Sequence, residues 1–532
     1  MRHRRPLLGD CQALVQMQGA VSVKSSHLIC CIGSEYGKPR EKMDDRLDYQ
    51  STTELVRALA ARRISAVELL ERAIARIEYY NPAINAVVVR DYVRARAAAI
   101  AADAALAKGE RRPLLGIPMT VKESFNVAGL PITWGIPMFQ YWQPNEDAVA
   151  VARLKAAGAI IIGKTNVPFA LSDWQSYNDV YGTTNNPWDF GRSPGGSSGG
   201  SAACVAAGFV SLELGSDIAG SLRAPAHFCG VSAHKPSYGL VPLRGHAWPK
   251  SEALDAEGDG YLAVGGPLAR TATDLALALD VLAGPDEEEA VAYGLTLPPA
   301  RHDNLKSFRV LIIDTHPLLP TASTVWAALN RLSDKLVESG ATVAHESALL
   351  PDLAESARIY TRLLFAFMSS ARTPQFDLET QAIVASLSPA DDSLAAMRFR
   401  GAVLSHRDWI AANEARAALR GRWSELFRDW DVVLCPPMST PAFPHDHGLD
   451  REARRIEIDG QPFPYEDQTV WPSVATLPGL PATVAPIDRL ESGLPIGIQI
   501  IGPYLEDRTT IAFAALIERE FGGFMPPPGY TT

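Results

Sequence analysis

Two serines carry the strongest chemical signal in this chain. Ser197 lies in the run 193–201 (SPGGSSGGS), and Ser221 lies in the stretch 217–223 (DIAGSLR). A glycine-rich backbone can reach positive φ values and approach another group closely. A serine that follows small residues can present its hydroxyl beside several backbone N–H groups, as acyl transfer requires for attack and for oxyanion binding. The two stretches together predict a hydrolytic active site.

The glycine-rich run has three other interpretations. Such runs are usually flexible linkers, but residues 195–201 lead directly into a small-residue helical stretch, 202–208, and a strand-like stretch, 209–214. A phosphate-binding loop lacks support because the Gly-Lys-Ser/Thr ending is absent. Residues 196–200 match G-x-S-x-G, the nucleophile elbow of α/β-hydrolases, but that turn follows a strand, and residues 185–194 are turn formers.

A serine nucleophile needs a base, and the candidate is Lys122. It follows the apolar, strand-like stretch 116–121 (GIPMTV) and precedes Glu123. The histidines nearest the serines, His227 and His234, stand in no arrangement that singles one of them out as a base. Because no H-E-x-x-H or comparable metal-ligand spacing occurs, we expect neither a metal nor another cofactor.

Several motifs, in order and spacing, resemble the amidase signature family. The three strongest are 116–123 (GIPMTVKE), 195–201 (GGSSGGS) and 215–223 (GSDIAGSLR). Further stretches look like landmarks of the same family: 181–188, 228–230 with Lys235-Pro236, 477–482 and 493–502. The resemblance covers the chain from about residue 50 to about residue 510. It implies one large α/β/α domain, with a twisted mixed sheet that is covered by helices.

The same resemblance implies roles for individual residues. Ser221 is the expected nucleophile, Ser197 is the bridging serine on a cis peptide bond, and Lys122 is the base at the end of the proton relay. The relay is chemically sound, because burial disfavours the charged form of an amine and lowers its pKa. The implied oxyanion hole consists of the backbone N–H groups of four successive residues: Ile218, Ala219, Gly220 and Ser221.

The surroundings of the serines supply further candidates. Ser198 and Trp174 are expected to bind substrate, and Asp217 and Arg223 match family positions that hold the loop. The chain departs from the usual glycine of the family at Ala219 and again at Ala233. A helical stretch with aromatic and apolar residues either lines an acyl pocket or belongs to the core: Tyr360, Leu364, Phe365, Phe367 and Met368.

These residues need a scaffold, and the chain alternates between helix and strand signals. Ser51-x-x-Glu54 and Ser65-x-x-Glu68 match capping boxes, and the second helix is expected to end near Asn81-Pro82. Strand, helix and strand follow one another at 308–313, 323–338 and 341–344, which predicts a βαβ unit. Near the end, 482–486 and 496–501 are expected to form a closing hairpin or an adjacent edge pair.

Composition limits the class of protein. The chain has 532 residues, 47% of them hydrophobic, and a net charge of −10, which argues against a nucleic-acid partner. The six cysteines show no C-x-x-C pairing, which predicts a reducing, cytoplasmic compartment. No stretch approaches the roughly 18 uninterrupted apolar residues of a membrane span. Residues 1–44 are expected to be a disordered extension before a domain at 45–525, with Met43 as an alternative start.

The predicted function is amide hydrolysis by a Ser-Ser-Lys acyl-enzyme mechanism. Carboxamides would be cleaved to a carboxylic acid and ammonia or an amine, with a small-molecule substrate and with either a monomer or a homodimer. The alternative is the glutamine-hydrolysing subunit of a tRNA-dependent amidotransferase, which resembles the same family. A catalytically inactive binding protein is a third class, which the joint presence of Lys122, Ser197 and Ser221 disfavours.

Overall fold

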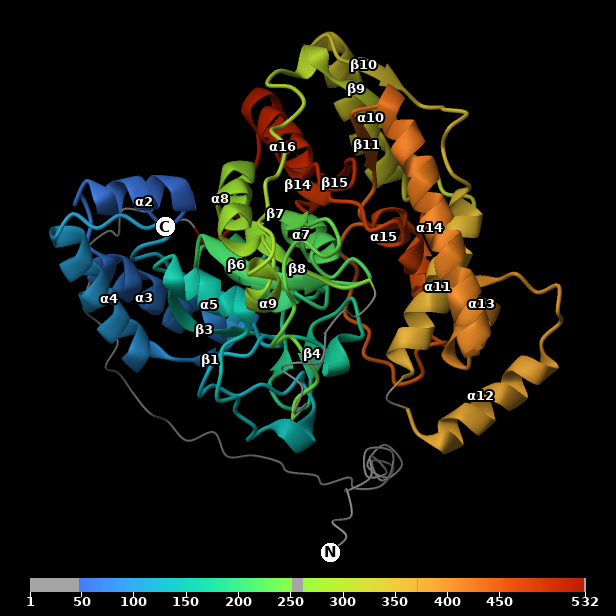
Figure 1. Ribbon diagram of the computed structural model, residues 1–532, viewed down its shortest axis with the longest axis horizontal. Helices are drawn as coiled ribbons and strands as arrows, with labels where there is room; N and C mark the ends of the chain where they lie inside the picture. The colour runs from blue at the N-terminus through green and yellow to red at the C-terminus, as the bar shows by residue number, and fades with distance from the viewer. Residues whose placement is uncertain (1–46, 251–261, 371, 531–532) are drawn as a thin grey trace, which may run out of the picture.

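An eleven-stranded mixed sheet organises the molecule (Figure 1). The structure is a computed structural model that describes residues 47–250, 262–370 and 372–530. The expected extension, 1–44, lies outside the described residues, and the domain limits of 45 and 525 stay predictions. The strands of the sheet, in spatial order, are β1 (Val87–Arg90), β3 (Ile160–Thr165), β2 (Pro118–Lys122), β6 (Leu212–Asp217), β8 (Val264–Ala269), β7 (Ser232–Lys235), β14 (Ala482–Arg489), β15 (Pro495–Ile501), β11 (Val432–Cys435), β9 (Arg309–Ile312) and β10 (Thr342–Ala344).

Parallel pairs flank an antiparallel middle in this sheet. Strands β3, β2 and β6 are parallel neighbours on one side, and β11, β9 and β10 are parallel neighbours on the other. The strands from β6 to β11 pair antiparallel, and so do β1 and β3 at the edge. The predicted βαβ unit is confirmed as β9, α10 and β10.

Helices cover the sheet, which confirms the expected α/β class. None of the helices in the described residues is long and apolar enough to cross a membrane. The helices are α2 (Thr52–Ala60), α3 (Ala66–Ile84), α4 (Tyr92–Ala107), α5 (Val149–Ala156), α6 (Gly199–Ala206), α7 (Arg223–Cys229), α8 (Ala272–Leu282), α9 (Glu287–Ala290), α10 (Ser323–Glu338), α11 (Leu353–Met368), α12 (Pro374–Ser386), α13 (Leu394–Ala402), α14 (His406–Asp429), α15 (Val470–Thr476) and α16 (Asp507–Phe521).

Short elements complete the chain. Two small antiparallel hairpins form, β4 (Tyr177–Asn178) with β5 (Gly182–Thr183) and β12 (Arg455–Ile458) with β13 (Gln461–Pro464). The 3₁₀ turns are η2 (Pro137–Phe139), η3 (Phe169–Leu171), η4 (Leu305–Ser307) and η5 (Tyr465–Thr469).

The C-terminal hairpin forms as expected, but not at an edge. Strands β14 and β15 pair antiparallel, and β7 and β11 flank them on the two sides. The hairpin alternative is therefore confirmed, and the edge-pair alternative is wrong. Every position of β15 is buried, as is typical of a strand with both faces covered.

Helix α3 also differs from its prediction. The capping boxes at Ser51 and Ser65 form, but α3 continues through Pro82 to Ile84 and ends on Asn85 in the left-handed conformation. The Asn81 carboxamide accepts hydrogen bonds from the backbone N–H groups of the two residues that lead into β1, at 2.8 and 2.9 Å. These bonds stabilise a last turn that proline by itself disfavours.

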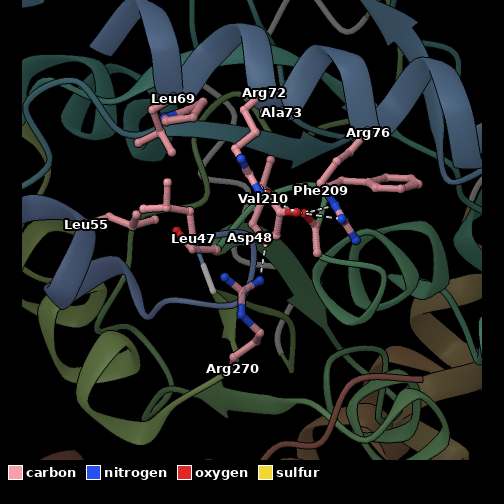
Figure 2. A pocket seen from close by; sticks show the side chains of 13 residues that line it. Leu47, Asp48, Leu55, Leu69, Arg72, Ala73, Arg76, Phe209, Val210 and Arg270 are labelled. Carbon is pink, nitrogen blue, oxygen red and sulfur yellow. Dashed lines mark hydrogen bonds and ion pairs between the residues drawn. The ribbon is translucent and has the colours of Figure 1, made fainter. Parts of the chain in front are cut away.

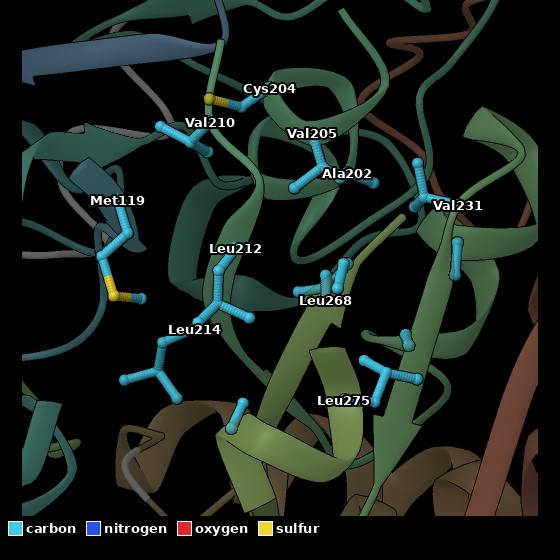
Figure 3. Close-up of a cluster of buried hydrophobic side chains, with 14 of the residues drawn as sticks. Met119, Ala202, Cys204, Val205, Val210, Leu212, Leu214, Val231, Leu268 and Leu275 are labelled. Carbon is cyan, nitrogen blue, oxygen red and sulfur yellow. The ribbon is translucent and has the colours of Figure 1, made fainter. Parts of the chain in front are cut away.

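Small residues let α6 lie close to the sheet. All eight residues of α6 are buried, so its alanines and glycines pack against the strands, as a linker would not. Figure 3 shows part of this core, which joins side chains of α6, β6, β8 and α8: Ala202, Val205, Leu212, Leu214, Leu268 and Leu275.

Asp48 ties the start of the described chain to α3. Its carboxylate accepts hydrogen bonds from Arg72 and from Arg76, the latter at 2.7 Å (Figure 2). Arg76 also donates to the carbonyl of Ala207, directly after α6, at 2.8 Å. Through Arg76, the segment before α2 is thereby linked to the end of α6, the helix that begins within the serine- and glycine-rich run.

The candidate residues lie at the ends of strands or just before helices. Lys122 is the last residue of β2 and Asp217 is the last residue of β6. Because β2 and β6 are parallel neighbours, their carboxyl ends lie at the same edge of the sheet. Ser197 lies just before the start of α6, and Ser221 lies just before α7.

We predict that Gly266→Ala in β8 lowers the free energy of unfolding by about 1–3 kcal/mol, because overpacking forces the backbone to move. A Cβ at Gly266 would collide with the backbone carbonyl of His234 in β7. The matched control is Gly294→Ala, where no atom lies within 4 Å of the new Cβ. Urea denaturation measures both variants, and equal effects would contradict the prediction.

Candidate active site

A buried lysine lies at the centre of the site. Lys122 Nζ is 2.6 Å from Ser197 Oγ and 2.9 Å from Ser216 Oγ. The Lys122 side chain is fully buried. Burial lowers its pKa to about 7, although the carboxylates of Asp217 and Glu213 act in the opposite direction. A large fraction of the amine is therefore neutral near pH 7 and able to accept a proton.

Ser197 sits in a loop that is packed on all sides. The Gly196–Ser197 peptide bond is cis, as the family resemblance implied. Every residue from 193 to 201 is buried, which rules out a flexible linker. A Cβ at Gly196 would collide with the carbonyl of Asp173, and one at Gly200 would collide with the backbone of Asn166. Glycine is needed in this run because neighbouring backbone approaches closely.

Asp217 anchors the turn that carries Ser221. Its carboxylate accepts hydrogen bonds from the backbone N–H groups of Gly220, at 2.9 Å, and Leu222, at 3.0 Å. Arg223 donates to both carboxylate oxygens, at 2.8 and 3.0 Å. Burial by itself raises the pKa of Asp217, but the Arg223 guanidinium and these N–H groups outweigh it and hold the pKa at about 2.

Arg223 extends this anchor into the C-terminal half of the chain. Its remaining donors reach Gln499 Oε1 in β15 at 2.5 Å, Thr476 Oγ1 at 2.7 Å and the Pro472 carbonyl at 3.0 Å. Both the Arg223 and Asp217 side chains are fully buried. The turn is therefore fixed by residues that lie far away in the sequence.

The carbonyl groups of the turn are all hydrogen-bonded. The carbonyls of Ile218, Ala219, Gly220 and Ser221 accept, in order, from Tyr360 Oη (2.8 Å), Trp174 Nε1 (2.8 Å), Ala224 N (2.7 Å) and Ser198 N (3.2 Å). In the part of the chain that the structure describes, the N–H groups of Ile218, Ala219 and Ser221 have no acceptor. Such free groups are suited to bind an oxyanion. The N–H of Gly220 is bonded to Asp217, which weighs against its predicted role in the oxyanion hole.

Ser198 and Trp174 both lie at the turn and hold it. The Ser198 hydroxyl donates to the Ser216 carbonyl at 3.2 Å and accepts from the Ser216 N–H at 3.4 Å. The Trp174 ring lies 5.5 Å from the ring of Tyr465. Their substrate-binding roles stay predictions, since the contacts that both make are with protein groups.

Two contributors to the site were not named from the sequence, Ser216 and the Asp173–Arg454 pair, and a third, Tyr360, was named there only as a pocket or core residue. Ser216, the hydroxyl of Tyr360 and the Asp173–Arg454 ion pair (2.6 Å) all support the site. Ser216 directly precedes Asp217 within the GSD motif, which is a signal that could have drawn attention to it. No local pattern joins Tyr360 to the turn, because 142 positions separate it from Ile218.

The histidines that were set aside as bases are buried and bonded elsewhere. His227 Nε2 is 3.0 Å from the Thr440 carbonyl, and His234 bridges Thr483 and Asp507 at 2.9 and 3.0 Å. Burial lowers the pKa of His227 to about 4. Across residues 47–250, 262–370 and 372–530, no group of His, Cys, Asp or Glu side chains is arranged to hold a metal ion.

Comparisons with known proteins all find relatives of one family. A family model described as amidase matches residues 68–511. A glutamyl-tRNA(Gln) amidotransferase subunit of Roseiflexus castenholzii is 34% identical over 494 residues, which cover 88% of this chain and 96% of that protein. A putative amidase, AmiB2, of Mycobacterium tuberculosis is 34% identical over 472 residues, with 87% and 94% covered.

A solved structure supports the same family. It is an inhibitor-bound vestigial protein complex, described as revealing the evolutionary origins of an s-triazine catabolic enzyme. This chain is 29% identical to it, with a TM-score of 0.74, and the match covers 89% of this chain and 99% of that chain.

We predict that Arg223→Met lowers the free energy of unfolding by about 3–5 kcal/mol, because Asp217 then remains buried without its cation. The matched control is Arg508→Met, whose partner Asp280 forms an exposed ion pair; removing such a pair costs about 1 kcal/mol or less. Urea denaturation at neutral pH measures both, and a loss at Arg223 no larger than at Arg508 would contradict the prediction.

Proposed function

Because the chain belongs to the amidase signature family of amide-hydrolysing enzymes, we propose that it cleaves carboxamides to a carboxylic acid and ammonia or an amine. The proposed mechanism is a Ser-Ser-Lys acyl-enzyme. The observation that carries it is the 2.6 Å contact between Ser197 and a fully buried lysine whose pKa lies at about 7.

In the first half-reaction, Lys122 takes the proton of Ser197, which takes the proton of Ser221. Ser221 Oγ attacks the carbonyl carbon, and free N–H groups of the turn, among them those of Ala219 and Ser221, bind the negative charge on the substrate oxygen. When the C–N bond breaks, the relay returns the proton to the leaving nitrogen. Water then attacks the acyl-enzyme with the same relay as base and releases the acid.

An apolar acyl group fits the surroundings of the turn. Ala219 packs against two hydrophobic clusters, one that contains Trp174, Phe228 and Met438, and another that contains Leu262 and Tyr360. We extend the proposal to aryl or medium-chain amides, because an apolar acyl group beside Ala219 would then be removed from water on binding.

The alternative function is that of the glutamine-hydrolysing subunit of a tRNA-dependent amidotransferase, which the 34% identity to such a protein favours. Glutamine carries an α-carboxylate that would need a cation. The arginines that contact the turn or the loop of Trp174 are already paired: Arg223 with Asp217, Arg451 with Glu466 and Arg454 with Asp173. This pairing supports the amidase proposal over the alternative.

The remaining expectations belong to the same proposal. We propose a small-molecule amide as the substrate and no nucleic-acid or membrane partner. A homodimer and a cytoplasmic location stay predictions from the sequence.

The pH dependence follows from the state of Lys122. The neutral amine is the proposed base, so kcat/KM for an amide should rise with pH and reach half of its plateau at about pH 7, where burial places the pKa. Initial rates from about pH 5 to about pH 9 measure the profile. Lys122→Met should lower kcat by at least about 10²-fold at every pH. A flat wild-type profile would contradict the assignment of Lys122.

Substrate class is tested by incubating the purified protein alone with aliphatic, aryl and indole acetamides and with glutamine. We expect ammonia release from an apolar amide and its loss, by about 10⁶-fold, in Ser221→Ala. The control is Ser386→Ala, an exposed serine at the end of α12. Glutamine turnover only after the partner subunits of an amidotransferase are added would support the alternative instead, and ligand binding without turnover would support an inactive binding protein.

A further inference from the structure

Two side chains from different hydrophobic clusters hold adjacent peptide units of the turn before Ser221. Tyr360, on α11, donates its hydroxyl hydrogen to the Ile218 carbonyl at 2.8 Å. Trp174 donates its indole N–H to the Ala219 carbonyl at 2.8 Å. The two donors belong to separate hydrophobic clusters, and both clusters reach Ala219.

Because a peptide unit is planar, a hydrogen bond that fixes the direction of its carbonyl also fixes the direction of its N–H. In a planar trans peptide, the carbonyl oxygen and the N–H hydrogen of the next residue point in opposite directions. The Ile218 carbonyl and the Ala219 N–H belong to one such unit. When Tyr360 holds the carbonyl on one side, the Ala219 N–H is directed to the other side, where it is left without an acceptor in the described residues.

The two peptide units differ in how many anchors they have. The unit between Ala219 and Gly220 is held at both ends, by Trp174 at its oxygen and by Asp217 at its N–H, at 2.9 Å. The unit between Ile218 and Ala219 is held by Tyr360 at its oxygen, and its N–H is the group that remains available. In the described part of the chain, the hydrogen bond from Tyr360 Oη is the one side-chain contact that holds the Ile218–Ala219 peptide. Loss of this hydroxyl therefore frees that peptide to rotate.

We infer that Tyr360 is a positioning residue for amide hydrolysis, which aims the Ala219 N–H at the developing oxyanion through its hydrogen bond to the Ile218 carbonyl. This inference rests on the proposed function of the same site. Tyr360 acts through the backbone and does not touch substrate, because its side chain is fully buried and its hydroxyl is occupied by Ile218.

The position of Tyr360 is itself well determined. Its helix begins after Asp352, whose side chain caps the backbone N–H of Glu355. The ring packs in a cluster with Leu363 and Leu364 of the same helix and Leu477 of the segment after α15. Burial raises the pKa of the Tyr360 phenol, which therefore stays protonated and remains a donor across the working pH range. The sequence left open whether Tyr360 lines a pocket or belongs to the core, and the structure places its ring in the core.

The test is Tyr360→Phe, which removes one oxygen and keeps the ring. We expect kcat for the best amide substrate to fall by about 10- to 100-fold, somewhat less than for complete removal of an oxyanion donor, while KM stays within about twofold. The matched control is Tyr504→Phe, which removes a phenol–carbonyl hydrogen bond of 2.9 Å to Tyr238 at another place. The control should keep the wild-type kcat, with a thermal midpoint close to that of Tyr360→Phe.

A boronic acid with the acyl group of the best substrate gives a readout that a merely structural role would not change. Ser221 Oγ donates an electron pair to boron and its proton passes to the relay, so the adduct is a tetrahedral anion that imitates the transition state. Its affinity should fall in Tyr360→Phe by the same factor as kcat, whereas inhibition by the product acid should not change. A kcat and a boronate affinity within twofold of wild type would overturn the inference.

Failure of the proposed function gives a different result from failure of this inference. Absence of amide turnover and of boronate binding in the wild-type protein would reject the function itself. A crystal structure of Tyr360→Phe then still decides, without any substrate, the structural part of the inference, which is that Tyr360 positions the Ile218–Ala219 peptide. A rotated or disordered Ile218–Ala219 peptide would support it, and an unchanged, ordered peptide would overturn it.

Discussion

The site depends on an amine that is held in the protein interior and, among the residues that the structure describes, is bonded to hydroxyls and not to a carboxylate. Lys122 Nζ contacts the hydroxyls of Ser197 and Ser216, which stabilise the neutral amine as well as the charged one. A carboxylate in direct contact would favour the charged form, which cannot act as the proposed base. The acid of the turn, Asp217, is instead fully used by Arg223 and by backbone N–H groups. Arg223 therefore holds the turn, and burial of Lys122 lowers its pKa although Asp217 and Glu213 raise it.

Glu213, in the same strand as Asp217, is a second buried carboxyl group near the site. It is buried beside Thr165, whose hydroxyl donates to it at 2.5 Å, and burial raises its pKa to about 7. A carboxyl group with a pKa of about 7 is only partly ionised near pH 7, so it carries less negative charge than an ordinary glutamate. Both carboxyl groups still raise the pKa of Lys122, and burial of the amine outweighs them.

The turn before Ser221 illustrates how a fold can leave donors free. Its four carbonyls are all satisfied by other groups of the chain, so its backbone has one defined orientation. Buried N–H groups without acceptors are costly. Ser221 is buried and Ala219 is half-buried, and the N–H groups of both persist because the surrounding contacts fix the turn. Such preorganised donors stabilise charge in the transition state without reorganisation during the reaction.

The sequence by itself determined the family, the residues of the proposed chemistry and much of the framework. The motifs around Lys122, Ser197 and Ser221 are local, and so are the capping boxes of α2 and α3 and the alternation of β9, α10 and β10, because each depends on residues close together in the chain. Only the tertiary structure decided where β14 and β15 lie in the sheet, that α3 passes through Pro82, and which groups hold the turn. Tyr360, Gln499 and Arg454 meet the site across long stretches of sequence, with 142 positions between Tyr360 and Ile218. Such contacts arise from packing of whole elements, and no local pattern of residue types encodes them.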